Sequence, residues 1–235
     1  MENYAQFIER ISAFEKPVLE FGADGFWLNP NIKRKLSENN TFRPFYGDTT
    51  VFDLTEEIKV RLNSMVDFIY DKAGECFAQR IKTNAFHITL HDLSNSRNLS
   101  KIGEEMFRNE LTLLKFVHSK KIQACTINFE TNYIINMVGT SLVLALKPKT
   151  KDDYDKLMNL YTVVDCAKTL PYPLTPHITL AYYNVNGFGA ESAERLCRTV
   201  NTLNKNSFDI SVSTDLLYYE KFTDMNSYHR IFSFT

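Results

Sequence analysis

Apolar residues recur at helical spacing in several stretches of the chain. The clearest begins at Thr55, which precedes Glu56 and Glu57 as a capping residue typically does, and it ends near Gly74. The same period predicts helices over residues 100–118, 152–164 and 190–203 and a short amphipathic helix within residues 1–22. A turn signal, Gly-Ala-Asp-Gly at residues 22–25, follows that short helix.

Alternating or β-branched runs between these stretches predict strands. The first covers residues 49–54 and is entered through Gly47-Asp48, a typical turn signal. Further strands are predicted over residues 76–82, 84–90, 122–130, 133–138, 141–146, 176–182, 208–213, 216–219 and 230–234. Strands mixed with helices, many of them antiparallel neighbours along the chain, indicate an α+β architecture with helices on the outer faces.

The order of elements is similar in the two parts of the chain. The strands at residues 84–90 and 176–182 each follow one helix and precede another. Sequence identity between the two parts is slight, so we expect a structural duplication and not a solenoid repeat.

The composition is that of a folded protein without a strong electrostatic field. The 235 residues are 44% hydrophobic and 13% aromatic, which is enough for a substantial core. The 27 basic and 28 acidic residues leave a formal charge of −1, so duplex DNA and membrane surfaces are not expected partners. No apolar run approaches the roughly 18 residues of a membrane span, and the N-terminus lacks a signal-peptide pattern.

The cysteines indicate an intracellular protein. They are far apart and show no metal-ligand spacing, which favours reduced thiols and a cytoplasmic location. They are Cys76, Cys125, Cys166 and Cys197.

One tetrapeptide, His-Ile-Thr-Leu, occurs at residues 87–90 and again at residues 177–180. Side chains alternate across a strand, so His87 and Thr89 share one face while the apolar residues take the other. His177 and Thr179 share a face in the second copy for the same reason. We expect the two polar faces to meet across a groove.

Two imidazoles that face each other suit acid–base chemistry on a phosphodiester. One takes a proton from the attacking oxygen and the other protonates the leaving oxygen, and an ordinary imidazole pKa of about 6.5 permits both roles. The hydroxyls of Thr89 and Thr179 would donate to the non-bridging oxygens. His87 and His177 are therefore the candidate catalytic residues, and the sequence does not say which is the acid.

The paired motif resembles the two-histidine (2H) phosphoesterase superfamily, whose signature is two His-x-Thr/Ser motifs about half a chain apart. The matching segments are residues 85–90 (AFHITL) and 175–180 (TPHITL), and Pro176 before the second histidine is typical. Members include 2′-5′ RNA ligase-like proteins, cyclic phosphodiesterases and phage enzymes that cleave cyclic oligonucleotides. The segment Gly47 to Val51 also resembles a bacterial branch, and the choice between bacterial and phage branches stays open.

The resemblance implies an activity and a fold. The activity is metal-independent hydrolysis, without cofactor, of a cyclic phosphate or a 2′-linked nucleotide, short oligonucleotide or RNA end by a cytoplasmic monomer. The fold is one bilobal α+β domain over residues 1–235 with pseudo-twofold symmetry and two antiparallel sheets that line a central groove. Residues 1–47 would form an N-terminal extension, residues 48–130 the first half and residues 131–235 the second half.

Two alternatives remain open at this stage. His91 lies four residues after His87 and shares its predicted face, so His87, His91 and His177 are a possible ligand set for a metal hydrolase. The other alternative is a nucleotide-binding sensor that does not turn its ligand over.

Possible substrate contacts flank the two motifs. Tyr183 follows the second motif, and Phe45 and Tyr46 precede the first strand, where their rings are candidates for stacking on a base. Arg43 is a candidate phosphate contact, and His91 is expected at the strand end or the rim of the groove.

Overall fold

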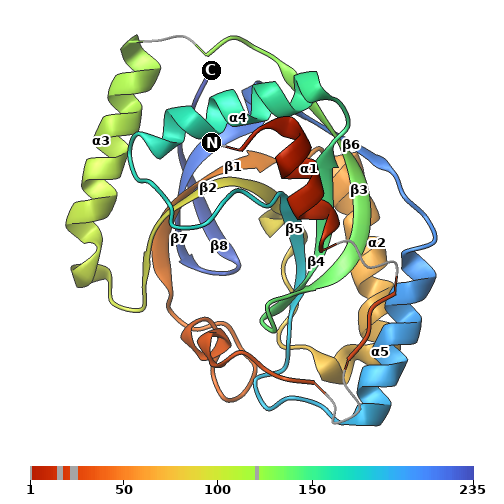
Figure 1. Ribbon diagram of the computed structural model, residues 1–235. Helices are drawn as coiled ribbons and strands as arrows, with labels where there is room; N and C mark the ends of the chain where they lie inside the picture. Colours follow the sequence, from red (N-terminus) through yellow and green to blue (C-terminus); the bar gives the residue numbers. More distant parts are fainter. Residues whose placement is uncertain (1, 15–17, 22–25, 120–121) are drawn as a thin grey trace.

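The strands form two four-stranded antiparallel sheets in the part of the chain that the structure describes (Figure 1). This computed structural model describes residues 2–14, 18–21, 26–119 and 122–235, so the turn predicted at residues 22–25 lies outside it. The first sheet has the order β2 (His87–Ser96), β1 (Tyr46–Asp53), β7 (Leu217–Asp224) and β8 (Ser227–Ser233). The second has the order β5 (His177–Tyr182), β4 (Ser141–Pro148), β3 (Thr126–Met137) and β6 (Asp209–Ser213).

Helices cover the outer sides of the sheets, as predicted. They are α1 (Tyr4–Ser12), α2 (Glu56–Ala73), α3 (Gly103–Ser119), α4 (Lys151–Asp165) and α5 (Ala190–Leu203). Helix α4 contacts β2, β3 and β4 and thereby joins the two sheets, while α2 and α5 pack against each other (Figure 1). The α+β prediction with two antiparallel sheets is confirmed, and Thr55 caps α2 by accepting from the Ile58 amide. Among the described residues, no helix combines the length and the apolar character that crossing a membrane requires.

Two strand predictions were wrong. Residues 76–82 contain no strand, because Phe77 makes only an isolated bridge to Tyr183. The apolar residues of this segment are buried by packing instead, and the Phe77 ring, for example, contacts Tyr70 of α2. The strands predicted over residues 122–130 and 133–138 are one strand, β3, which a register shift between Thr131 and Ile134 interrupts. That local irregularity produced the apparent break in the apolar pattern.

The two sheets are not the two halves of the sequence. The predicted boundary at residue 130 lies inside β3, and β7 and β8 join the sheet that contains β1 and β2. Strand β1 pairs with β2 on one side and with β7 on the other, so a segment near the end of the chain completes the first sheet.

The segment before β1 is part of the fold. Phe7 and Ile11 of α1 are buried, and the Phe7 ring packs against Tyr154 of α4. Further along, Asn40 donates to Asn184 near the end of the second motif strand. The predicted N-terminal extension over residues 1–47 therefore packs on the body of the protein through both of its ends.

Each motif strand lies at the end of its sheet and contains the same irregularity. In β2, Thr89 pairs with Val51 and His91 pairs with Thr50, so Leu90 is an extra, unpaired residue. In β5, Thr179 pairs with Val143 and Ala181 with Leu142, which leaves Leu180 unpaired. Such a bulge reverses the side-chain alternation beyond it. The matching bulges are the clearest sign of the pseudo-twofold relation.

Gly47 and Asp48 belong to β1, although the sequence pattern indicates a turn. The buried Asp48 carboxylate accepts from the Ser94 amide at 2.8 Å, from Asn109 at 3.0 Å and from the Tyr219 hydroxyl at 3.0 Å. It therefore ties β1 to β2, α3 and β7. Burial raises the pKa of Asp48, and these hydrogen bonds oppose that shift.

Gly47 is required for close packing, which gives a stability prediction. A Cβ atom there would lie 2.3 Å from the Phe222 ring and 2.3 Å from the Ser94 carbonyl oxygen. Gly47→Ala is therefore expected to lower the free energy of unfolding by about 1–3 kcal/mol in urea denaturation, as overpacking typically does. Gly103→Ala is the matched control, because nothing lies within 4 Å of its Cβ position. A Gly47→Ala protein as stable as the control variant would contradict the packing argument.

Candidate active site

The two motif histidines are anchored in the same way. Nδ1 of His87 lies 2.9 Å from the Ala85 carbonyl oxygen, and Nδ1 of His177 lies 2.7 Å from the Thr175 carbonyl oxygen. A carbonyl only accepts, so each Nδ1 carries the proton of the hydrogen bond. Among the described residues, neither Nε2 has a partner. Nε2 of each ring is thus the atom that binds or releases a proton.

The two imidazoles lie within electrostatic reach of each other. Strands β2 and β5, each at one end of its sheet, contact one another, and the charge of His177 lowers the pKa of His87. The two strands that carry the motifs therefore lie next to each other, each at the edge of its sheet (Figure 1).

Burial is the main influence on both histidines. Desolvation lowers the pKa of His87 to about 4, against the opposing effects of the Ala85 carbonyl and the Asp92 charge. It also lowers the pKa of His177, where the Lys35 charge acts in the same direction. Both imidazoles are therefore neutral in the free protein near pH 7, and an anionic ligand between them would favour protonation of one.

Thr89 and Thr179 lie two residues after the histidines on the same strand faces, and they pair with Val51 and Val143. Each is partly buried. Within the described parts of the chain, neither hydroxyl forms a hydrogen bond with protein. Both are thus available to donate to a ligand oxygen.

Beyond the bulges, the two strands present different side chains on the motif face. Asp92 follows in β2, and its negative charge raises the pKa of both His87 and His177. Tyr182 follows in β5, and its hydroxyl lies 3.4 Å from Nζ of Lys35. The pseudo-twofold site therefore has an acidic and a basic side.

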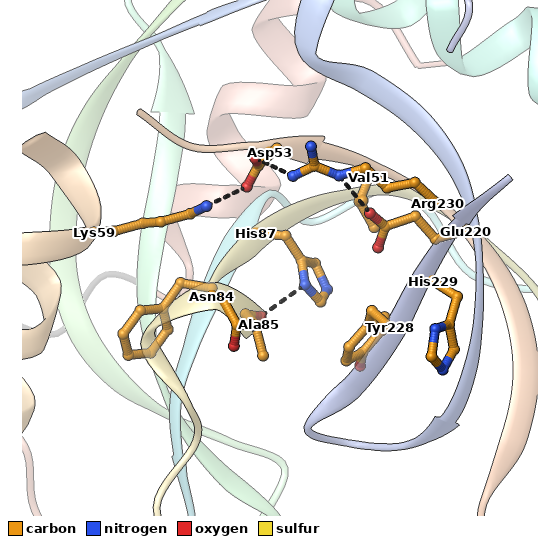
Figure 2. A pocket seen from close by; sticks show the side chains of 11 residues that line it. Val51, Asp53, Lys59, Asn84, Ala85, His87, Glu220, Tyr228, His229 and Arg230 are labelled. Carbon is orange, nitrogen blue, oxygen red and sulfur yellow. Dashed lines mark hydrogen bonds and ion pairs between the residues drawn. The ribbon is translucent and has the colours of Figure 1, made fainter. Parts of the chain in front are cut away.

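A cavity of about 420 Å³ opens beside His87 (Figure 2). Every residue that lines it belongs to the first sheet, to α2 or to the loop before β2. The lining residues are Val51, Asp53, Lys59, Asn84, Ala85, Phe86, His87, Glu220, Tyr228, His229 and Arg230. The Tyr228 ring meets the His87 ring edge-on with 4.8 Å between the centroids.

The charges in this cavity are paired. Asp53 binds Lys59 at 2.8 Å, accepts from the Leu54 amide and forms an ion pair with Arg230. Arg230 also lies 3.5 Å from Glu220 through its Nε atom. Burial raises the pKa of Glu220 to about 7, and the Arg230 charge opposes this.

The prediction for His91 was wrong. The bulge at Leu90 turns His91 to the face opposite Thr89, where it is 1% exposed and packs on Tyr161 of α4. Its Nδ1 donates to the Asp92 carbonyl, and its Nε2 lies 3.3 Å from Asp165. His91 is therefore a residue of the core and not of the groove rim.

The alternative metal site is not formed, because His91 does not converge with His87 and His177. In the described ranges, no group of three His, Cys, Asp or Glu side chains is arranged to hold a metal ion.

Two of the aromatic candidates are packing residues. Tyr183 is fully buried, and its ring centroid lies 4.3 Å from that of Phe26 and 5.7 Å from that of Phe77, so it does not reach a ligand in the groove. Phe45 is 4% exposed and packs on Phe222. A single strand pattern does not reveal the bulge that moves Tyr183 into the core.

The remaining candidates lie away from the histidines. Tyr46 pairs with Ser96, at the opposite end of the β1–β2 ladder from the Asp53–His87 pair. Arg43 lines a separate cavity of about 190 Å³ and donates to the Lys33 carbonyl at 3.3 Å.

Several groove residues gave no sequence signal. Asp92, Lys35, Glu220 and Arg230 come from four different segments, and none belongs to a recognisable motif.

Comparison with known proteins supports the fold. No family model and no curated protein matches the chain. Among solved structures, a conserved protein of unknown function from Agrobacterium tumefaciens has a TM-score of 0.69 at 16% identity, over 89% of this chain and 94% of that chain. Escherichia coli LigT in apo form has a TM-score of 0.45 at 15% identity, over 81% and 96% of the two chains. The similarity to the Agrobacterium protein establishes a shared fold.

The lowered pKa of His87 predicts a pH-dependent stability. The unfolded chain binds a proton at this residue near pH 6.5 and the folded chain only near pH 4, so the free energy of unfolding decreases as the pH falls between these values. From pH 7 to pH 5 this residue removes about 2 kcal/mol. His87→Gln is expected to abolish that part of the decrease in urea denaturation, whereas replacement of the exposed His118 is expected to keep it. Equal decreases in all three proteins would contradict the burial of a neutral His87.

Proposed function

We propose that this protein is a metal-independent phosphodiesterase of the two-histidine type that hydrolyses a cyclic phosphate or a 2′-linked nucleotide or short oligonucleotide. The observation that carries the proposal is the matched anchoring of His87 and His177. Each Nδ1 donates to a backbone carbonyl two residues earlier, and each Nε2 lacks a partner among the described residues. Two such atoms across one groove supply a base and an acid.

The reaction follows from this arrangement. One neutral imidazole takes a proton from water at Nε2 as the water oxygen bonds to phosphorus, and the other, protonated, gives its proton to the oxygen whose bond to phosphorus breaks. The Thr89 and Thr179 hydroxyls donate to the non-bridging oxygens, where negative charge accumulates. The opposite proton transfers restore the starting states, and no cofactor takes part.

The protein would act as a cytoplasmic monomer on small nucleotides or RNA ends. The cysteines at positions 76, 125, 166 and 197 are free thiols, which is typical of reducing compartments and supports this location. The charge of −1 gives no general attraction for long nucleic acid, so a small substrate is favoured.

Replacement of either histidine tests the mechanism. His87→Ala and His177→Ala are each expected to lower kcat for 2′,3′-cyclic nucleotides about 10²- to 10⁴-fold, with smaller changes in KM, because each removes one proton transfer. His118→Ala is the control, since this exposed residue lies at the end of α3. The assays are run with and without a chelator, which is expected to have no effect. Tight nucleotide binding by the wild type without any turnover would instead identify a nucleotide-binding module.

The pH dependence gives an independent test. Because burial lowers the pKa of both histidines, the state with one neutral and one protonated imidazole is most populated below pH 6.5. We expect a bell-shaped profile of kcat/KM with its maximum on the acidic side of neutrality and an acid limb extending to about pH 4, the pKa of His87. A profile that rises to a plateau above about pH 8 would contradict this assignment.

A further inference from the structure

A basic segment contacts the far ends of both motif strands. It consists of the short helical turn Pro30–Arg34 and Lys35, which follows the turn directly. Nη2 of Arg34 donates to the Asn95 side chain near the end of β2 at 3.0 Å, and Nζ of Lys35 donates to the Tyr182 hydroxyl at the end of β5 at 3.4 Å. Two consecutive cations therefore connect the two strands that carry the histidines.

The Lys35 ammonium group is held in place by the backbone and by two aromatic rings. The Lys35 amide donates to the Ile32 carbonyl at 2.9 Å, and the Lys35 carbonyl accepts from the Arg43 amide at 3.0 Å. Nζ lies 5.1 Å from the centroid of the Tyr182 ring and 5.8 Å from that of the Phe45 ring. The rings position the charge but do not neutralise it.

Lys35 differs from the other lysines that are not exposed, because it has no carboxylate partner in the part of the chain that the structure describes. Each of the others lies no more than 3.6 Å from a carboxylate oxygen; they are Lys59, Lys147, Lys156, Lys168 and Lys221. The Tyr182 hydroxyl donates to Sδ of Met225 at 3.2 Å, so its oxygen accepts from Lys35. Two of the three ammonium N–H groups remain for a ligand, and a half-buried charge favours an anion.

The position of Lys35 is distinct from the phosphate site at the histidines. Tyr182 lies one same-face step beyond Thr179, because their partners in β4, Ser141 and Val143, are two residues apart. Such a step is roughly 7 Å along a strand, which is comparable to the separation of neighbouring phosphates in an extended nucleic acid. Lys35 is therefore placed for a second anion and not for the one between the histidines.

The opposite side of the groove repels an anion. Asp92 occupies the place in β2 that Tyr182 occupies in β5, and its carboxylate accepts from the Tyr172 hydroxyl at 3.2 Å. A negatively charged chain that leaves the histidines meets a carboxylate on one side and an ammonium group on the other. The charges thus direct it toward Lys35.

We propose that Lys35, with Arg34 beside it, binds a second phosphate of the substrate, one nucleotide away from the phosphate between the histidines. The substrate is then an oligonucleotide end with an internal phosphodiester next to the reacting phosphate, and a mononucleotide leaves Lys35 unoccupied. Lys35 determines specificity and takes no part in proton transfer. The inference rests on the proposed function only in placing the first phosphate between the histidines.

Binding of two matched dinucleotides tests the inference without any need for turnover. Diuridine 3′-phosphate is compared with its analogue in which a neutral methylphosphonate replaces the internal phosphodiester, so the bases and the terminal phosphate are the same. Calorimetry on the wild-type protein is expected to show about tenfold tighter binding of the charged dinucleotide. Lys35→Met, which keeps the apolar stem between the two rings, is expected to reduce this difference to within about threefold. Lys115→Met removes one charge from an exposed position of α3 and is expected to keep the wild-type difference.

Thermal unfolding of Lys35→Met checks that the variant is folded, and Lys35→Gln replaces it if it is not. Equal binding of the two dinucleotides by the wild type, no binding of either, or an unchanged difference in the Lys35 variant would each overturn the inference. Hydrolysis of the 2′,3′-cyclic phosphates of uridine and diuridine is measured in parallel. Charge-dependent binding without hydrolysis would refute the proposed function alone, whereas hydrolysis without charge-dependent binding would refute the second phosphate site alone.

Discussion

An extra residue in each motif strand determines which side chains the groove contains. Leu90 in β2 and Leu180 in β5 are unpaired, and beyond each of them the strand presents its other face. A regular strand would place His91 and Ala181 beside the motif threonines. The bulges place Asp92 and Tyr182 there instead and turn His91 into the core against α4. The electrostatics of the site therefore depend on backbone register as much as on the histidines.

The pseudo-twofold relation holds for the motif residues but not for the residues around them. The histidines, the threonines and the bulges occur in both copies, and these are the parts that the proposed reaction requires on opposite sides of one phosphorus atom. The surroundings differ: Asp92 and the charged cavity lie on the first-sheet side, and Lys35 and Tyr182 lie on the second. A symmetric centre with asymmetric walls suits a substrate whose two substituents on phosphorus are unlike.

The parts of the fold that were predictable are those with a local cause. Periodicity identified the helices and most strands, and Thr55 marked the start of α2. Gly47 and Asp48 were misassigned because tertiary contacts, and not a local turn, require these two residues. Gly47 makes room for Phe222 and the Ser94 carbonyl, and Asp48 binds side chains from α3 and β7. The motif histidines could be identified because the same tetrapeptide occurs twice. Glu220 and Arg230 could not, because only the pairing of β7 with β1 and of β8 with β7 brings them to the cavity next to His87.

The strand order of the first sheet has a consequence for how the protein folds. Strand β1 pairs with β7, which follows it by most of the length of the chain, so β1 has one open edge until β7 has been synthesised. Contacts between such distant segments slow folding, and an open strand edge is prone to pair with other chains in the meantime. The α2 segment and the β2 motif can form earlier, but the wall of the cavity beside His87 cannot. The nascent chain therefore holds both motifs before it holds a complete site.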